Sequence, residues 1–255
     1  MSLFDAALLR FNVLSIDTEF PGFLHNTPRD APPAVRYDDL KYNVDNTKII
    51  QLGITLSDDE GNIGDTWEFN FSEFDVEKDA YVEESIQLMK NNGVNFEKIR
   101  SDGIGRGVFP NAEGFAECAT KYFESVFDIK VVAKYCQGLL GGNLGLSKLA
   151  KILDVKRSGE AHNAGSDSLV TAAVFAKIKE CYEVEEEYFE GILYGMEARI
   201  KRRQAEIIVE RYCQQLNPQH PSCPPPRFED YCCPPFPSCP YNYSVPIPSN
   251  VFVMM

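Results

Sequence analysis

The sequence predicts an α/β fold in which a mixed β-sheet is flanked by helices. Three apolar, strand-like stretches come first, and they are followed by segments whose apolar residues recur at helical spacing. The apolar content of 44% is typical of a globular chain, and 255 residues are enough for one domain with a sizeable core. We therefore expect one main domain with appendages.

The three expected strands cover residues 11–16, 48–56 and 63–71. Residues 58–62 separate the second strand from the third, and they form a glycine-containing turn of hairpin length. The second and third strands should therefore pair in antiparallel orientation.

Helices are expected after these strands. Residues 78–92 carry apolar side chains at helical spacing and are followed by Gly93, a typical helix stop signal. Further helices are expected over residues 112–126, 144–153, 166–182 and 196–216, and a short strand over residues 127–132.

The composition changes after residue 216. Residues 217–255 contain most of the prolines, which lack a backbone N–H, so this tail is predicted to be disordered. His220 and Cys223 are spaced like half of a zinc site. No second Cys-x-x-Cys pair is present, however, and adjacent cysteines fit tetrahedral ligation poorly. The expected organisation is a domain over residues 1–195, a helix over 196–216 and a disordered tail.

The formal net charge of −13 disfavours a general electrostatic grip on duplex nucleic acid, which needs clustered Lys and Arg. It is compatible with an enzyme that engages only the end of a single strand. Asp5 and Arg10 interrupt the first apolar stretch, and no run reaches the roughly 18 apolar residues of a membrane helix. An intracellular protein with no membrane contact and mostly reduced cysteines is expected.

The run Asp-Thr-Glu-Phe-Pro-Gly at residues 17–22 directly follows the first predicted strand. Two carboxylates that are two residues apart on a strand point to the same face, so Asp17 and Glu19 can hold one metal ion together. This pattern predicts a metal-dependent hydrolase.

A second group of candidate residues lies in Ala-His-Asn-Ala-Gly-Ser-Asp-Ser at residues 161–168. His162 and Asp167 would lie on different faces of a continuous helix. The useful arrangement therefore has His162 on a loop and Asp167 in the first helical turn, with Gly165 and Ser166 as turn and cap. The helix dipole favours an ionised Asp167, as a metal ligand must be, and a histidine can accept a proton from water.

Together with four further motifs, these two runs resemble the Pop-two/Caf-one deadenylases, the catalytic exonuclease subunits of the CCR-NOT messenger-RNA deadenylation complex. The further motifs are Leu-Lys-Tyr-Asn-Val-Asp at residues 40–45, Lys-Ile-Ile-Gln-Leu-Gly at 48–53, Trp-Glu-Phe-Asn-Phe at 67–71 and Ser-Ile-Gln-Leu at 85–88. The resemblance is collinear over roughly residues 12–195. It implies a ribonuclease-H-like fold of the Asp-Glu-Asp-Asp exonuclease superfamily.

The resemblance also implies an activity, which is the stepwise release of 5'-AMP from the 3' end of a poly(A) tail. Family members use two divalent ions, Mg²⁺ or Mn²⁺, to stabilise the attacking and leaving oxygens. Asp17 and Glu19 match the first acidic pair, Asp167 the last metal ligand and His162 the general base. The implied partners are single-stranded poly(A) RNA, the CCR-NOT scaffold and a companion deadenylase subunit, in the nucleus and cytoplasm.

The sequence departs from the family pattern near residues 110–125, where it is much shorter. The remaining family Asp lies in a stretch resembling Trp-Val-Thr-Phe-His-Ser-Gly-Tyr-Asp-Phe-Gly-Tyr-Leu, which also supplies a central strand, and no such stretch is present. Asp128 matches a different family position. Without this Asp, the second metal site should be weakened.

Two structural outcomes are expected from this departure. Either residues 125–132 dock beside the first strand, or the sheet lacks a central strand and its core is incomplete. Two alternatives to an active enzyme follow: a catalytically impaired pseudo-deadenylase that binds the scaffold, or the product of an incomplete gene model.

Overall fold

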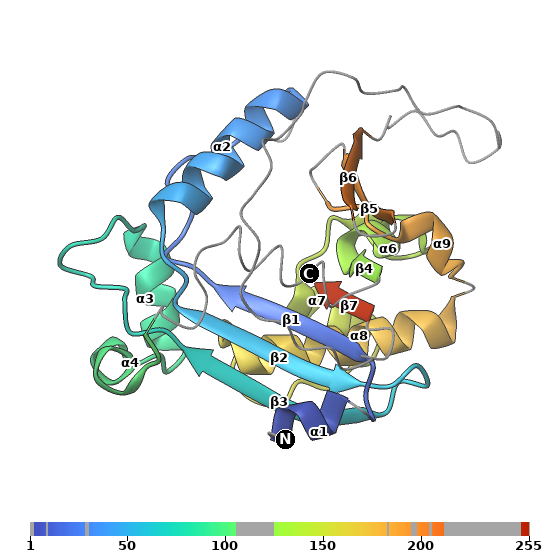
Figure 1. Cartoon of the computed structure of the whole chain (residues 1–255), viewed down its shortest axis with the longest axis horizontal. Helices are drawn as coiled ribbons and strands as arrows, with labels where there is room; N and C mark the ends of the chain where they lie inside the picture. Colours follow the sequence, from blue (N-terminus) through green and yellow to red (C-terminus); the bar gives the residue numbers. More distant parts are fainter. Residues whose placement is uncertain are drawn as a thin grey trace.

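A computed structural model of the chain describes residues 3–8, 10–28, 31–105, 125–182, 184–194, 198–203, 206–211 and 251–254. Within this part of the chain, a five-stranded sheet with the order β3-β2-β1-β7-β4 is flanked by helices (Figure 1). The predicted mixed sheet with flanking helices is confirmed. No helix among the described residues is both long and apolar enough to cross a membrane.

One half of the sheet is an antiparallel meander. β1 (Val13–Glu19) pairs with β2 (Gln51–Ser57), which pairs with β3 (Ile63–Asn70). The predicted antiparallel pairing of the second and third strands is confirmed. Residues 13–16 of β1 are buried on both faces, which explains why three of these four residues are apolar.

The longest described helix, α8 (Ala164–Cys181), packs across β1 and β2. Its apolar residues Val170, Val174 and Ile178 belong to the largest buried cluster, which also contains Val13 of β1. The other described α-helices are α1 (Leu3–Leu8), α2 (Pro33–Asn46), α3 (Glu83–Asn91), α4 (Phe96–Asp102), α6 (Ile129–Tyr135), α7 (Leu146–Ile152) and α9 (Glu186–Phe189).

Two predicted elements are corrected. The strand expected over residues 127–132 is β4 (Ser125–Asp128), and α6 begins directly after it because the Asp128 carboxylate accepts a hydrogen bond from the Lys130 N–H at 2.9 Å. The helix expected over residues 196–216 is wrong, because β5 (Ala198–Arg203) and β6 (Glu206–Arg211) pair in antiparallel orientation. The β-branched residues 207–209 favour that outcome.

The largest departure from expectation is β7 (Val251–Met254), which lies between β1 and β4 and is parallel to both (Figure 1). The composition predicts disorder for the whole tail, and these four residues contradict it.

Residues 212–250 and most of the helix predicted over residues 112–126 lie outside the described part of the chain. β4 does not dock beside β1. The position beside β1 is filled instead by β7, a segment that the sequence does not place there.

Candidate metal-binding active site

The first pair of candidate ligands lies at the carboxyl end of β1. Asp17 is the register partner of Gly53, and Glu19 is the partner of Gln51, both in β2. The alternation of side chains along a strand places both carboxylates on the face of the sheet that α8 covers. Both are half-buried.

Strand β2 fixes where α8 begins. A Cβ atom on Gly53 would lie 1.8 Å from the carbonyl oxygen of Ala164, so only glycine allows this approach. The neighbouring Gln51 is 2% exposed, and its Oε1 accepts a hydrogen bond from the Ala164 N–H at 3.4 Å. Its Nε2 donates to Asn70 Oδ1 at 2.8 Å and to Glu68 Oε1 at 3.2 Å. The start of α8 is therefore attached directly to the sheet.

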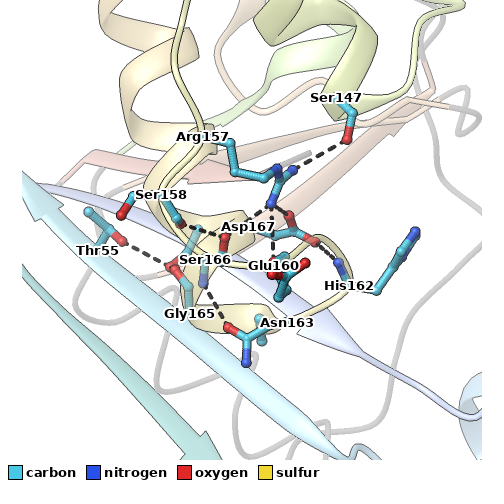
Figure 2. A network of polar contacts seen from close by, with 12 residues as sticks. Thr55, Ser147, Arg157, Ser158, Glu160, His162, Asn163, Gly165, Ser166 and Asp167 are labelled. Carbon is cyan, nitrogen blue, oxygen red and sulfur yellow. Dashed lines mark hydrogen bonds and ion pairs between the residues drawn. The ribbon is translucent and has the colours of Figure 1, made fainter. Parts of the chain in front are cut away.

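The predicted placement of His162 on a loop and Asp167 in the first turn of α8 is confirmed. The cap differs from expectation: the Asn163 side chain accepts from the Ser166 N–H at 3.0 Å, whereas the Ser166 hydroxyl donates to the Ser158 carbonyl (Figure 2). His162 is exposed and has a left-handed backbone with φ of 59°. Its N–H donates to Asp167 Oδ2 at 3.0 Å, which holds the loop against the helix.

Arg157 is a site residue that the sequence did not single out. Its Nη1 forms an ion pair with Asp167 Oδ1 and donates to Ser166 Oγ at 3.1 Å, and its Nη2 donates to Ser147 Oγ of α7 (Figure 2). A lone arginine in a polar loop is ordinarily solvated, so nothing marked it in advance. Gln51 did carry a signal, because it interrupts an apolar strand.

The structure brings Glu19, His162 and Asp167 together. One ligand atom from each lies within 4.8 Å of the others. Burial raises the pKa of Asp17 to about 8, and the charges of Asp167 and Glu19 add to this shift while Arg157 opposes it. Burial, and then the charge of Asp167, raise the pKa of Glu19 to about 7. Ionised carboxylates therefore destabilise one another here.

This donor set fits a hard divalent cation. Carboxylate oxygens suit Mg²⁺ or Mn²⁺, and a cation would offset the repulsion between the acids. Asp17 interacts electrostatically with the cluster but is not one of the three closely spaced groups. No other cluster of three such donors occurs among the described residues.

Asp128 lies apart from the cluster of Glu19, His162 and Asp167. Its Oδ1 accepts from the Lys130 N–H and its Oδ2 from the Tyr194 N–H, both at 2.9 Å. It lies on β4, with β7 between it and β1. Asp128 therefore caps α6 and holds the backbone at Tyr194.

An open cleft of about 510 Å³ lies beside the site. Ser147 and Lys151 of α7, Asn92, and Arg157 with other residues of the loop between α7 and α8 line it. The three clustered donors do not line the cleft. Arg157 joins the two regions, because it lines the cleft and also pairs with Asp167.

Comparison with known sequences gives the family. Residues 3–105 match the CAF1 family ribonuclease domain. The chain is 38% identical to the probable CCR4-associated factor 1 homolog 1 of Arabidopsis thaliana, over 74% of this chain and 63% of that protein. It is 36% identical to the putative homolog 8 of that plant, over 70% and 90%, and 31% identical to the poly(A) ribonuclease pop2 of Schizosaccharomyces pombe, over 75% and 67%.

Solved structures support the same family assignment. The S. pombe Pop2p structure with Mg²⁺ and Mn²⁺ bound has a TM-score of 0.64 at 30% identity, over 76% of this chain and 94% of that one. A yeast CAF1 co-crystallised with the NOT1 MIF4G domain gives 0.55 at 25% identity, over 75% and 91%. The mixed sheet with acids at the end of β1 defines a ribonuclease-H-like nuclease fold. The chain belongs to the CCR4-associated factor 1 family, the CAF1/Pop2 deadenylases.

Proposed function

We propose that the protein is a divalent-metal-dependent 3'-5' exoribonuclease that shortens messenger-RNA poly(A) tails as a subunit of the CCR-NOT complex in the nucleus and cytoplasm. The observation that carries the proposal is the convergence of Glu19, His162 and Asp167 next to Asp17, on the scaffold of a deadenylase family. The name of the S. pombe relative supports poly(A) as the substrate. The yeast complex with NOT1 supports the scaffold as a partner.

Asp17, Glu19 and Asp167 would hold the divalent cation. When bound, the cation supplies positive charge that stabilises the transition state of phosphodiester hydrolysis. His162 accepts a proton from the attacking water, since its ring is exposed while its backbone is fixed to Asp167. Arg157 forms an ion pair with Asp167 and thereby orients this carboxylate. Water attacks phosphorus, the bond to the 3' oxygen of the preceding nucleotide breaks, and a nucleoside 5'-phosphate leaves.

The cleft beside Arg157 is the proposed position of the terminal nucleotide. Lys151 and Arg157 offer positive charge to phosphate, and Asn92 and Ser147 offer polar groups to a ribose or base. Three carboxylates leave two dications under-neutralised, so the second ion is proposed to bind more weakly than the first.

A second candidate function is a non-catalytic module that binds the CCR-NOT scaffold. It is favoured by one observation: among the described residues, the site contains the three carboxylates of Asp17, Glu19 and Asp167 and no fourth. This candidate shares the fold but predicts no hydrolysis.

The test is an assay with a 5'-labelled oligoribonucleotide ending in poly(A), with Mg²⁺ or Mn²⁺, followed on a denaturing gel. We expect stepwise 3' shortening that slows by roughly 10²- to 10⁴-fold in Asp17→Asn and His162→Ala. Asp65→Asn removes an exposed acid from β3 and should behave as wild type. A poly(U) tail should be shortened more slowly. A folded wild-type protein that leaves the RNA intact would support the scaffold-binding candidate instead.

A further inference from the structure

β7 is separated by a long stretch of sequence from both strands that it joins. Its residues 251–254 pair in parallel with residues 13–16 of β1 on one side and with residues 125–128 of β4 on the other. β1 and β4 make no pairing with each other, because β7 lies between them throughout (Figure 1). The two halves of the sheet are therefore connected through four residues.

Two side chains of β7, those of Val253 and Met254, contact apolar clusters on opposite faces of the sheet. Val253 is 0% exposed and belongs to the cluster that contains Val13, Phe127 and Val170 of α8. Met254 packs on the opposite side, against the cluster that contains Leu14 and Ile16. β7 therefore fills a central position in the sheet and makes apolar contacts on both faces.

Removing β7 would leave β1 and β4 about two strand spacings apart, roughly 10 Å. Their facing N–H and C=O groups would lose their partners, and unpaired buried backbone groups are strongly disfavoured. The affected part of β1, residues 13–16, ends one residue before Asp17. Docking of β7 thus supports the strand that positions the acidic site.

We propose that the gap between β1 and β4 is a binding site for an extended apolar tetrapeptide, and that residues 251–254 of the same chain occupy it. This is strand addition, in which backbone hydrogen bonds and alternating side-chain pockets provide recognition. Residues 212–250, fully extended, can span about 130 Å, which is ample reach. A tethered segment acts at a high effective concentration, which favours the chain's own strand over that of a second copy.

The direct test introduces a pair of cysteines at Ser15 and Val253, which are register partners across β1 and β7. Paired strands place Cα atoms about 4.8 Å apart, within the range of a disulfide. We expect the double variant Ser15→Cys/Val253→Cys, oxidised as the full-length protein, to yield from the monomer a pair of peptides joined by a disulfide between positions 15 and 253. Peptide mapping by mass spectrometry distinguishes this bond from any that involves the eight native cysteines.

The matched control is Ser15→Cys/Val251→Cys, because residue 251 is the partner of Val13 and lies two positions out of register. It should give at least tenfold less of the cross-linked peptide. Absence of the disulfide between positions 15 and 253 in folded protein would overturn the proposal. A bond found only in a disulfide-linked dimer would also overturn it, since the occupant would then be a second copy.

A milder variant gives an independent measurement. Val253→Thr keeps the side-chain shape but buries a hydroxyl group, and it should lower Tm by a few degrees. Amide hydrogen exchange should become faster in residues 13–16 and 125–128, the strands that β7 joins. Exchange rates in both strands of Val253→Thr that equal those of the wild type would contradict the proposal. Neither readout depends on nuclease activity, so the strand-addition proposal can be tested even if the proposed nuclease function is wrong.

Discussion

Single side chains determine the charge balance of the acidic site. Burial and neighbouring acids raise the pKa of Asp17 to about 8, burial and Asp167 raise that of Glu19 to about 7, and Arg157 opposes the shift at Asp17. In the metal-free protein these carboxyl groups bind protons more tightly when folded than when unfolded. Their contribution to stability is therefore complete below about pH 4 and is lost as the pH rises through 7 to 8.

The expected loss of stability with rising pH gives a prediction for protein treated with a chelator. Between pH 6 and pH 8.5, the Tm of the wild type should fall more steeply than that of Asp17→Asn, which cannot ionise at this position. Differential scanning fluorimetry across the pH range measures both slopes, with Asp65→Asn as the control that follows wild type. Parallel curves for wild type and Asp17→Asn would show that the pKa of Asp17 is not raised in the folded protein.

Arg157 should matter for stability because it pairs with a buried carboxylate. Its side chain is 21% exposed and that of Asp167 is 10% exposed. Arg157→Met leaves Asp167 without its positively charged partner. This should lower the free energy of unfolding by roughly 3 kcal/mol, measured in urea with the metal-free protein. Arg100→Met is the comparison: Arg100 pairs with Asp75 at 3.0 Å, but Arg100 is half-exposed and Lys78 also pairs with Asp75, so its loss should cost less than about 1 kcal/mol. Equal costs would refute the argument.

At the scale of elements, the site depends on how closely α8 approaches β2. Gly53 has no side chain where a Cβ would meet the Ala164 carbonyl, and Gln51 binds the first N–H of the helix. This approach places Asp167 of α8 opposite Asp17 and Glu19 of β1. The distance between two elements, rather than any one residue, sets the distance between the ligands.

Gly53→Ala tests that dependence. The added methyl group must displace α8, and overpacking of this kind costs roughly 1–3 kcal/mol or more. We expect a lower Tm together with a weaker response of Tm to Mn²⁺. Gly105→Ala is the control, since a Cβ there meets nothing within 4 Å. A Gly53→Ala protein with wild-type stability and metal response would show that the helix can move without affecting the site.

At the scale of the whole molecule, the sequence predicted the elements and the candidate ligands better than it predicted the topology. The alternating carboxylates at Asp17 and Glu19, the loop position of His162 and the helical position of Asp167 all follow from local spacing. The hairpin of β5 and β6 was missed because its charge order also suits a helix. β7 was missed because four apolar residues after a proline-rich stretch carry no local sign of their distant partners.

The overall charge also has a measurable consequence. With a net charge of −13, the protein should release few counterions on binding RNA, so affinity should depend only weakly on salt. Fluorescence anisotropy with the His162→Ala protein and labelled poly(A), at about 50 to 200 mM KCl and constant Mg²⁺, should show less than about a tenfold loss of affinity. A loss of about 10³-fold would indicate a basic RNA-binding surface and contradict the account.

The central claim is that residues of β1 and α8 form one divalent-cation site, and calorimetric titration of chelator-treated protein with Mn²⁺ tests it most directly. We predict saturable binding to the wild type and to Asp65→Asn, and at least tenfold weaker binding to Glu19→Gln and Asp167→Asn, because each removes one ligand of the cluster. Circular dichroism confirms that each variant is folded. Unchanged Mn²⁺ affinity in folded Asp167→Asn would place the metal elsewhere and contradict the account.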